Sequence, residues 1–228
     1  MLKTKRIAEP NGNTFQKATF MIYYEQSIEE GGNGSVIYYI SDLHFGHARV
    51  IDMDKRPFAS IEEIDATLIS RWNERVAEND DVYIVGDFAY RNGYSASWYL
   101  RRLKGKKHLL IGNHDRHTLA DASAVFCLES IDKMMRIVDG ERAVSLCHFP
   151  IAEWNGKRYG GYHVFGHLHT RRDDVYQFMS RFDHALNAGC MLNGYMPVTL
   201  DELIENNALF RQQKTVTEDN GAELGIPR

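Results

Sequence analysis

Five short apolar segments of this chain each end in an acid, an amide or an imidazole, and this pattern constrains the fold most. The segments are rich in β-branched and aromatic residues, as is typical of buried strands. They are VIYYISD (36–42), VYIVGD (82–87), KHLLIGNHD (107–115), AVSLCH (143–148) and YHVFGH (162–167). Open α/β sheets place ligands and chemistry at the carboxyl ends of their strands. The pattern therefore predicts several strands that deliver polar side chains to one site.

Helices are expected between and after these strands, over residues 60–80, over 95–104 and from 199 onward. The first and the last begin with a capping-box pattern, Ser60 with Glu63 and Thr199 with Glu202. Strand and helix alternate early in the chain, whereas the later strands follow one another with short links. This order favours a mixed α/β sandwich over a fully wound parallel sheet.

The length and composition are those of one globular domain with additions at its ends. The chain has 228 residues, of which 43% are hydrophobic. We expect an N-terminal extension over 1–34, which could add one strand at 18–24, then a main domain over 35–211. The polar residues 212–228 are expected to form a disordered tail.

Charge and cysteine content indicate the compartment and exclude some partners. A formal charge of -4 and a pI near 6.2 do not favour nucleic acid or an anionic membrane as the partner. No segment approaches the roughly 20 apolar residues of a membrane span. Cys127, Cys147 and Cys190 are odd in number and widely spaced, which argues against a disulfide framework. We therefore expect a cytoplasmic protein, with Cys147 in the core.

Eight polar residues stand at or just after the ends of the five apolar segments. They are Asp42, His44, Asp87, Asn113, His114, His148, His167 and His169. Each alone has an ordinary explanation, since Gly-Asp is a common turn and a lone histidine is usually a satisfied interior side chain. Their joint occurrence, always after an apolar run, indicates a metal site. Imidazole and oxygen donors without a thiolate suit Mn, Fe, Zn or Co rather than Mg or Ca alone, and they do not choose among these metals. We expect Mn, with Fe, Zn, Co or Ni as alternatives.

The same blocks resemble the calcineurin-like metallophosphoesterase superfamily. The resemblance rests on SDLHFGH (41–47), GD (86–87), GNHD (112–115), the isolated His148 and GHLH (166–169). It implies a four-layer αββα sandwich of two mixed β-sheets flanked by helices, with two divalent metal ions at the loops on one edge. One ion would be held by Asp42, His44, Asp87 and His169, and the other by Asp87, Asn113, His148 and His167. Asp87 would then bridge the ions, because each carboxylate oxygen can face one cation while the negative charge offsets their repulsion.

Hydrolysis of a phosphate ester is the reaction that the resemblance implies. Two adjacent cations bind phosphate oxygens and lower the pKa of a bridging water, so that hydroxide forms near neutral pH and attacks phosphorus. In the family, the histidine of the GNHD block lies near the leaving group, so we expect His114 to donate a proton or stabilise charge there. The alternative is that His114 only supports Asn113. Either a phosphodiester or a phosphomonoester fits, and we favour the diester.

The chain is more similar to small prokaryotic and phage-type metallophosphoesterases than to protein serine/threonine phosphatases. The phosphatases carry GDYVDRG where this chain has GDFAYRN, so Tyr90 replaces the acid that partners their catalytic histidine. Arg91 matches their phosphate-binding arginine, and His47 could also reach substrate, although either could simply be solvated or support its loop. The segments CHFPIAEWNG (147–156) and LNAGCMLNGYMPVTLDELIE (186–205) are like those of the small enzymes, except that Cys190 stands where many of them have an acid.

Two alternatives compete with a small-molecule phosphoesterase. One is a nuclease of the same superfamily, which would need a groove or a capping domain for DNA that neither the length nor the acidic balance indicates. The other is a catalytically silent scaffold of the same fold, which would be expected to have lost some metal ligands or His114. All of these residues are present. We therefore expect a small phosphate ester as the substrate and no membrane partner.

Overall fold

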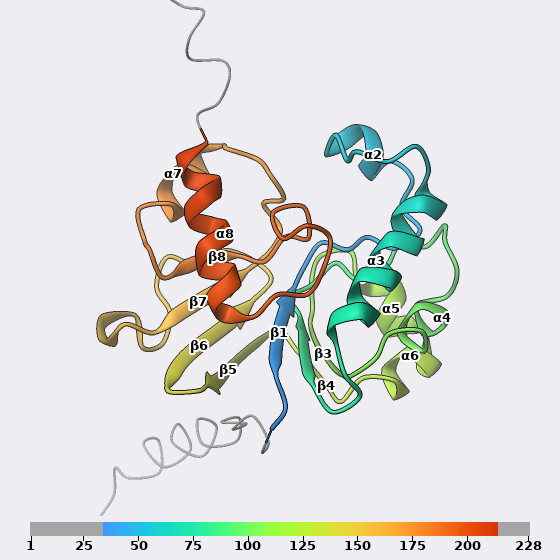
Figure 1. The fold of residues 1–228 in the computed structure, drawn as a ribbon, viewed down its shortest axis with the longest axis horizontal. Helices are drawn as coiled ribbons and strands as arrows, with labels where there is room; N and C mark the ends of the chain where they lie inside the picture. The colour runs from blue at the N-terminus through green and yellow to red at the C-terminus, as the bar shows by residue number, and fades with distance from the viewer. Residues whose placement is uncertain (1–33, 214–228) are drawn as a thin grey trace, which may run out of the picture.

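The computed structural model describes residues 34–213, which form two four-stranded sheets packed against each other (Figure 1). The first sheet contains, in spatial order, β1 (Ile37–Ile40), β2 (Asp81–Ile84), β3 (Lys106–Leu110) and β4 (Ser130–Asp132). The second contains β5 (Met134–Asp139), β6 (Arg142–Cys147), β7 (Tyr162–Phe165) and β8 (Ala185–Asn187). The five strands predicted from the apolar segments are β1, β2, β3, β6 and β7, and the predicted sandwich is confirmed.

The two sheets differ in the directions of their strands. The second sheet is mixed, as expected, because β5 runs antiparallel to β6 while β6, β7 and β8 are parallel. The first sheet is parallel in its four strands and has an antiparallel contact at the isolated bridge between Tyr39 and Val198. Among the strands of residues 34–213, only β5 and β6 are joined by a two-residue hairpin, which antiparallel strands allow, whereas parallel neighbours need longer crossovers.

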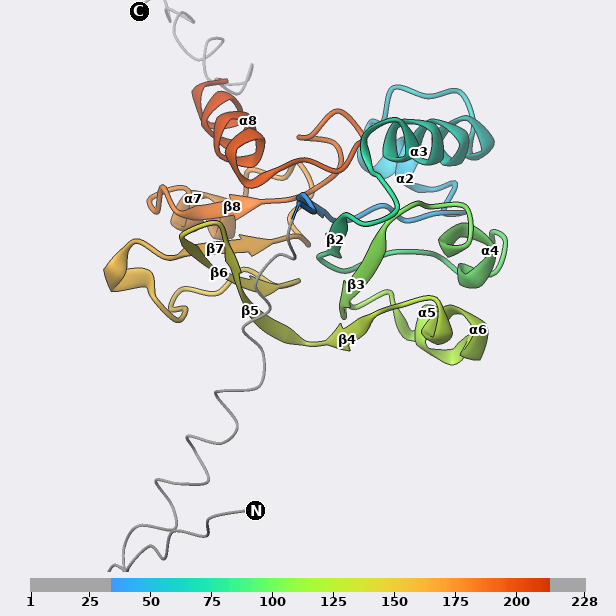
Figure 2. The ribbon, with the colours of Figure 1, turned by 60° about the horizontal axis from the view of Figure 1, so that its bottom comes forward.

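Helices cover the outer faces of both sheets and complete four layers (Figure 1 and Figure 2). Beside the first sheet lie α2 (Val50–Met53), α3 (Ile61–Arg75), α4 (Ala96–Leu100), α5 (Arg116–Ala120) and α6 (Ala122–Phe126). Beside the second lie α7 (Asp174–Met179) and α8 (Leu200–Gln212), and the 3-10 helix η1 (Lys157–Tyr159) precedes β7 in the chain. Among residues 34–213, no helix is both long enough and apolar enough to cross a membrane.

The first sheet is buried on both faces. Along β1, Tyr38 and Ile40 pack with the side chains beneath α3 and α4, whereas Ile37 and Tyr39 belong to the apolar layer between the sheets. Successive side chains of a strand point to opposite faces, so a strand covered on both sides must be apolar at every position. This burial explains why VIYYI is a continuous apolar run, and it positions the ends of β1, β2 and β3 at one edge of the sandwich.

The two predicted capping boxes form to different extents. At α8 the box is complete, because the Thr199 hydroxyl accepts from the Glu202 N–H and the Glu202 carboxylate accepts from the Thr199 N–H. At α3 the Ser60 hydroxyl accepts from the Glu63 N–H at 3.2 Å, which is the predicted half. The Glu63 carboxylate instead accepts from the N–H of Ala59 at 2.7 Å. The reciprocal bond is thus moved by one residue, and α3 still begins where predicted.

Several predicted boundaries differ from the structure or lie outside it. The helix predicted over 60–80 ends at Arg75, because Val76 is already extended. The helix predicted over 95–104 is shorter, because the chain turns after Leu100 toward Gly105, whose φ of 82° is left-handed. Gln212, the first residue of the predicted tail, ends α8. The remaining tail from 214 onward, and the extension up to residue 33 with its expected strand, lie outside the described residues.

Buried His163 on β7 should make stability depend on pH. Its Nδ1 lies 3.1 Å from the Ser145 carbonyl oxygen and its Nε2 accepts from the Ile151 N–H at 3.0 Å, so both ring nitrogens of the neutral form are satisfied. Burial lowers the pKa of His163 from 6.5 to about 4. Between these values the unfolded chain binds a proton that the folded chain does not. The contribution of neutral His163 to the free energy of unfolding is therefore full above pH 6.5 and is lost as the pH falls toward 4.

Chemical unfolding at pH 7.5 and pH 5 would measure this loss. We expect wild type to lose about 2 kcal/mol more stability over this interval than His163→Gln, because each pKa unit corresponds to about 1.4 kcal/mol. His117→Gln, at an exposed position, serves as the control and should behave like wild type. An identical pH dependence for wild type and His163→Gln would contradict the prediction.

Candidate metal centre

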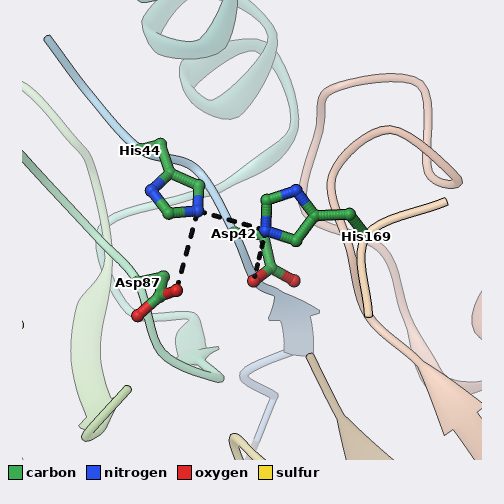
Figure 3. Close-up of side chains that lie close together, drawn as sticks. All are labelled: Asp42, His44, Asp87 and His169. Atoms are coloured by element: carbon green, nitrogen blue, oxygen red, sulfur yellow. Dashed lines mark hydrogen bonds and ion pairs between the residues drawn. The ribbon is translucent and has the colours of Figure 1, made fainter. Parts of the chain in front are cut away.

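The strand ends bring two groups of donor atoms together at one edge of the sandwich. In the first group, the side chains of Asp42, His44, Asp87 and His169 place one donor atom each within 4.8 Å of one another (Figure 3). The Nε2 atoms of His44 and His169 are 3.2 Å apart. Nε2 of His44 is 3.6 Å from Asp87 Oδ2, and Nε2 of His169 is 3.5 Å from Asp42 Oδ1. Two imidazoles and two carboxylates therefore converge on a space the size of one metal ion.

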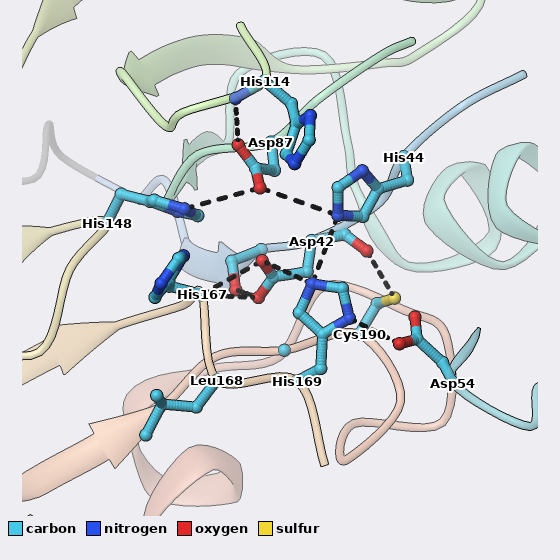
Figure 4. Close-up of polar contacts among 12 residues, drawn as sticks. Asp42, His44, Asp54, Asp87, His114, His148, His167, Leu168, His169 and Cys190 are labelled. Carbon is cyan, nitrogen blue, oxygen red and sulfur yellow. Dashed lines mark hydrogen bonds and ion pairs between the residues drawn. The ribbon is translucent and has the colours of Figure 1, made fainter. Parts of the chain in front are cut away.

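A second group lies beside the first and shares Asp87 with it (Figure 4). Nε2 of His148 is 3.5 Å from Asp87 Oδ2 and 3.1 Å from Asn113 Oδ1. Nδ1 of His167 is 3.0 Å from the same Asn113 oxygen. Asp87 presents one oxygen, Oδ2, to both groups, while its Oδ1 accepts from the His114 N–H at 2.8 Å. The expected arrangement has each Asp87 oxygen facing one ion, whereas in the structure Oδ2 is the oxygen near both donor groups and Oδ1 accepts from the backbone of His114.

Left-handed backbone conformations turn these side chains into the site. Five of the donor residues have φ between 51° and 68°, namely Asp42, His44, Asp87, His167 and His169. Each such conformation costs a non-glycine residue about 1–2 kcal/mol and persists only where the surrounding structure holds it. At the preceding Gly86, a Cβ would lie 2.6 Å from Cγ of His148. The backbone is thus strained at the residues that carry the donor atoms, and such strain is typical of functional sites.

Asp115, to which no role was assigned from the sequence, holds the loops after β2 and β3 together. Its buried carboxylate accepts from the N–H groups of Asp87, Phe88 and Gly112 at 2.8–2.9 Å. Burial raises the pKa of Asp115, and the three N–H donors oppose that rise. The sequence could have indicated a role for Asp115, because it is the last residue of the GNHD block.

Further residues orient the imidazoles by hydrogen bonds to the ring nitrogens that face away from the cluster. Asp54 Oδ1 lies 2.8 Å from Nδ1 of His169, so Nε2 of that ring faces the cluster. Asp54 Oδ2 accepts from buried Arg56, which also donates to the carbonyl oxygens of Asp42 and Leu43. A metal-binding histidine typically has its second nitrogen held in this way. No sequence motif marked Asp54 or Arg56, since both lie in an ordinary polar loop.

Two other contacts complete this support. Nδ1 of His148 lies 2.9 Å from the Val85 carbonyl oxygen, which turns its Nε2 toward Asp87 and Asn113. The buried Cys190 thiol donates to the Asp42 carbonyl oxygen at 3.3 Å, so Cys190 adjoins the first donor residue.

Cys147 is half-buried, and its predicted placement in the core is wrong, because its partner at the end of β5, Met134, is itself exposed.

The electrostatics of the cluster suit a cation. Burial alone would raise the pKa of Asp87, but the hydrogen bond and charge of His148, with His44 and the N–H of His114, lower it to about 2. Burial alone would lower the pKa of His148, but the carboxylates of Asp87 and Asp42 raise it to about 9. A cation that binds here therefore competes with a proton on His148, and its affinity should fall in acid.

The structure places the other predicted site residues at different distances from the cluster. The His114 ring is edge-on to that of His44, with centroids 5.2 Å apart. The buried His47 ring stacks on Tyr90 at 3.9 Å and lies 6.3 Å from that of His114. Arg91 is exposed and lies over the Tyr90 ring at 5.8 Å. His114 and His47 thus belong to the site, whereas Arg91 stands outside the donor groups.

A two-sheet αββα sandwich with imidazoles and carboxylates gathered at its strand ends defines a class of metal-dependent hydrolases. The chain belongs to the calcineurin-like phosphoesterase family, whose sequence model matches residues 35–219. The predicted resemblance is confirmed. Divalent metal ions and phosphoester hydrolysis are the general properties of this family, and the described cluster could hold such an ion.

Similar proteins come from an archaeon, phages and a bacterium. An uncharacterized protein of Methanocaldococcus jannaschii is 30% identical over 181 residues, which cover 77% of this chain and 94% of the relative. The gene 66 protein of Mycobacterium phage L5 is 29% identical over 161 residues, covering 58% of this chain and 77% of the relative. The crystal structure of a protein of unknown function from Aquifex aeolicus has a TM-score of 0.59 at 22% identity, covering 75% of this chain and 99% of that one. That structure has the same fold.

Replacing Asp54 by asparagine should weaken metal binding at the His169 end of the cluster. His169 and Arg56 use different oxygens of Asp54, and an asparagine offers an oxygen at only one of these two positions, so one of the two bonds is lost. We expect Mn affinity to fall about 10- to 100-fold, as is typical when the partner of a ligating histidine is removed. Competition with a fluorescent chelator would measure it, and Asp52→Asn on α2 is the exposed control. Equal affinity in wild type and Asp54→Asn would contradict the role of Asp54.

Proposed function

We propose that this chain hydrolyses phosphodiesters in preference to phosphomonoesters, with two divalent metal ions. One would bind Asp42, His44, Asp87 and His169, and the other would bind Asp87, Asn113, His148 and His167. The observation that carries this proposal is the shared oxygen, since Asp87 Oδ2 lies 3.6 Å from His44 Nε2 and 3.5 Å from His148 Nε2. Two ions so placed bind phosphate oxygens and activate water for in-line attack.

The remaining roles fall to residues around the donor groups. As the oxygen of water bonds to phosphorus and the bond to the leaving oxygen breaks, His114 would give that oxygen a proton. The proximity of its ring to that of His44, at 5.2 Å, supports this role. His47, between Tyr90 and the cluster, would contact the substrate. Arg91 would reach only a substrate that extends beyond Tyr90.

Charge favours a diester over a monoester. A phosphodiester carries one negative charge near neutral pH, whereas a monoester carries close to two. The donor groups already contain the carboxylates of Asp42 and Asp87, and Arg56 is buried behind Asp54. Arg91 lies over Tyr90 and not over the donors. Arg171, at the His167 end, is paired with Asp173 at 3.1 Å. With these arginines turned to other partners, the site would stabilise one charge better than two.

The metal, the partner and the compartment are part of the same proposal. A shell of imidazoles, carboxylates and one amide suits Mn, and Fe, Zn, Co or Ni are alternatives. The substrate would be a small phosphate ester, and nucleic acid is not favoured as a partner. All three cysteines are free, which is compatible with a reducing compartment such as the cytoplasm.

Hydrolysis assays on metal-stripped protein test the proposal. Bis-p-nitrophenyl phosphate and p-nitrophenyl phosphate would be supplied before and after Mn is restored, and bound Mn would be measured in parallel. We expect no turnover without metal, and preferential cleavage of the diester once about two Mn ions are bound. Preference for the monoester would overturn the diester assignment. No turnover with two ions bound would favour a scaffold of the same fold.

A further inference from the structure

An exposed aromatic ring stands at the rim of the cluster. Phe149 directly follows His148 and is 45% exposed. Its ring centroid is 5.0 Å from that of His148 and 4.8 Å from that of His167. Single exposed apolar residues are common on protein surfaces and carry no meaning by themselves. Phe149 differs because it packs against two rings of the donor groups and still leaves nearly half of its surface to solvent.

The backbone on both sides of Phe149 is held in place. The carbonyl oxygen of His148 accepts from the Gly166 N–H at 2.9 Å, and the Ile151 N–H donates to His163 Nε2 at 3.0 Å. Between them, Pro150 has a restricted φ. The Phe149 ring therefore projects from a fixed position. Because this segment is already ordered, binding a substrate group against the ring would cost little conformational entropy of the protein.

The aromatic rings around the cluster fall into two sets, which lie at its opposite ends. His44, His47 and His114 lie together at one end, with centroid distances of 5.2–6.3 Å among them. His148 and His167 lie at the other end, as Figure 4 shows, and Phe149 packs on them. In an in-line displacement the leaving oxygen departs opposite to the attacking water, while the other three oxygens of phosphorus lie between them. With the leaving group at His114, the oxygen that carries the non-leaving substituent lies between the leaving oxygen and the attacking water, so this substituent extends sideways from that line and can reach the side of the cluster where Phe149 packs on His148 and His167.

We propose that Phe149 is a specificity-determining residue that contacts the non-leaving substituent of a phosphodiester and favours an aromatic group there, either an aryl ring or a nucleobase. This inference rests on the proposed function and narrows its substrate class. A phosphomonoester has no substituent for Phe149 to contact, so the ring acts on diesters alone. Contacts of this kind, between an aromatic side chain and an aryl ring or a base, change affinity or rate by about 10-fold.

Diesters with one leaving group and different second substituents isolate this contact. Bis-p-nitrophenyl phosphate and methyl p-nitrophenyl phosphate both release p-nitrophenolate, and only the first leaves an aryl group behind. The measured quantity is the ratio of their kcat/KM values, because effects on metal binding or on leaving-group departure cancel in it. We expect the ratio to fall about 10-fold in Phe149→Ala and in Phe149→Leu, and to stay within about twofold in Phe149→Tyr, which keeps the ring. Phe126→Ala, at a 92% exposed position on α6, is the control.

Binding of uncleaved diesters separates the two proposals. Diphenyl phosphate and dimethyl phosphate would be titrated calorimetrically into Mn-loaded wild type and variants of equal Mn content. Tighter binding of diphenyl phosphate that is lost in Phe149→Ala and Phe149→Leu supports the subsite, even if hydrolysis assays defeat the proposed function. A wild-type kcat/KM ratio and wild-type binding preference in both variants would overturn the role of Phe149, whatever the activity.

Discussion

Replacing Asp87 by asparagine is expected to remove both metal ions and nearly all activity. The His114 N–H donates to Asp87 Oδ1, so an asparagine at this position will keep its oxygen there. Its amide nitrogen then takes the place of Oδ2, which faces His44 and His148. An amide N–H cannot ligate a cation, and the bridging negative charge is lost as well. We expect kcat/KM to fall at least about 1000-fold, which corresponds to about 4 kcal/mol of barrier.

Metal analysis of purified Asp87→Asn would show whether both ions depend on this residue. We expect Mn per chain to fall from about two to less than one, with a circular dichroism spectrum like that of wild type. Asp174→Asn, at an exposed position in the first turn of α7, is the matched control. Two retained ions together with wild-type activity would show that Asp87 does not bridge them.

Replacing His114 by alanine is expected to lower turnover while both metal ions stay bound. The contact of His114 with Asp87 is made by its backbone N–H, which alanine retains. The variant therefore loses only the imidazole. A positioned proton donor typically contributes about 100- to 10,000-fold to the rate. The loss should be large for an alkoxide leaving group and smaller for p-nitrophenolate, which departs without protonation near neutral pH.

The dependence on the leaving group distinguishes proton donation from mere support of Asn113. We would measure kcat for a p-nitrophenyl diester and for a dialkyl diester, with Mn content determined for each preparation. His117→Ala, three residues further on and exposed on α5, is the control. An equal loss on both substrates, accompanied by loss of metal, would assign His114 a supporting role.

Donor residues were predictable because each is tied to a local pattern. An apolar run with β-branched and aromatic residues predicts a strand, and a Gly-Asp or Gly-Asn pair directly after it predicts the turn that presents Asp87 or Asn113. The same short-range rules placed the starts of α3 and α8 at Ser60 and Thr199. These features depend on a few neighbouring residues, so the strand ends and the donor types could be inferred without knowledge of the packing.

Other features of the site could not be predicted, because they join segments far apart in the chain. His44 and His169 meet across 125 residues, and the pairing of Asp54 with His169 spans 115. Which Asp87 oxygen lies near both donor groups depends on where the loop after β3 puts one N–H group. Nothing in the loop that contains Asp54 and Arg56 distinguishes it from any other polar loop. Such contacts arise only when the elements pack.

The sequence by itself determined which side chains can bind metal and that they stand at strand ends, since backbone propensity and side-chain alternation act over a few residues. Only the tertiary structure decided which atoms face one another. The packing of the two sheets places His148 and His167 opposite His44 and His114, with Phe149 packed on His148. Hydrogen-bond partners choose the ring nitrogen that His148 and His169 present. Orientation is a property of the packed core and its hydrogen bonds, and no local pattern encodes it.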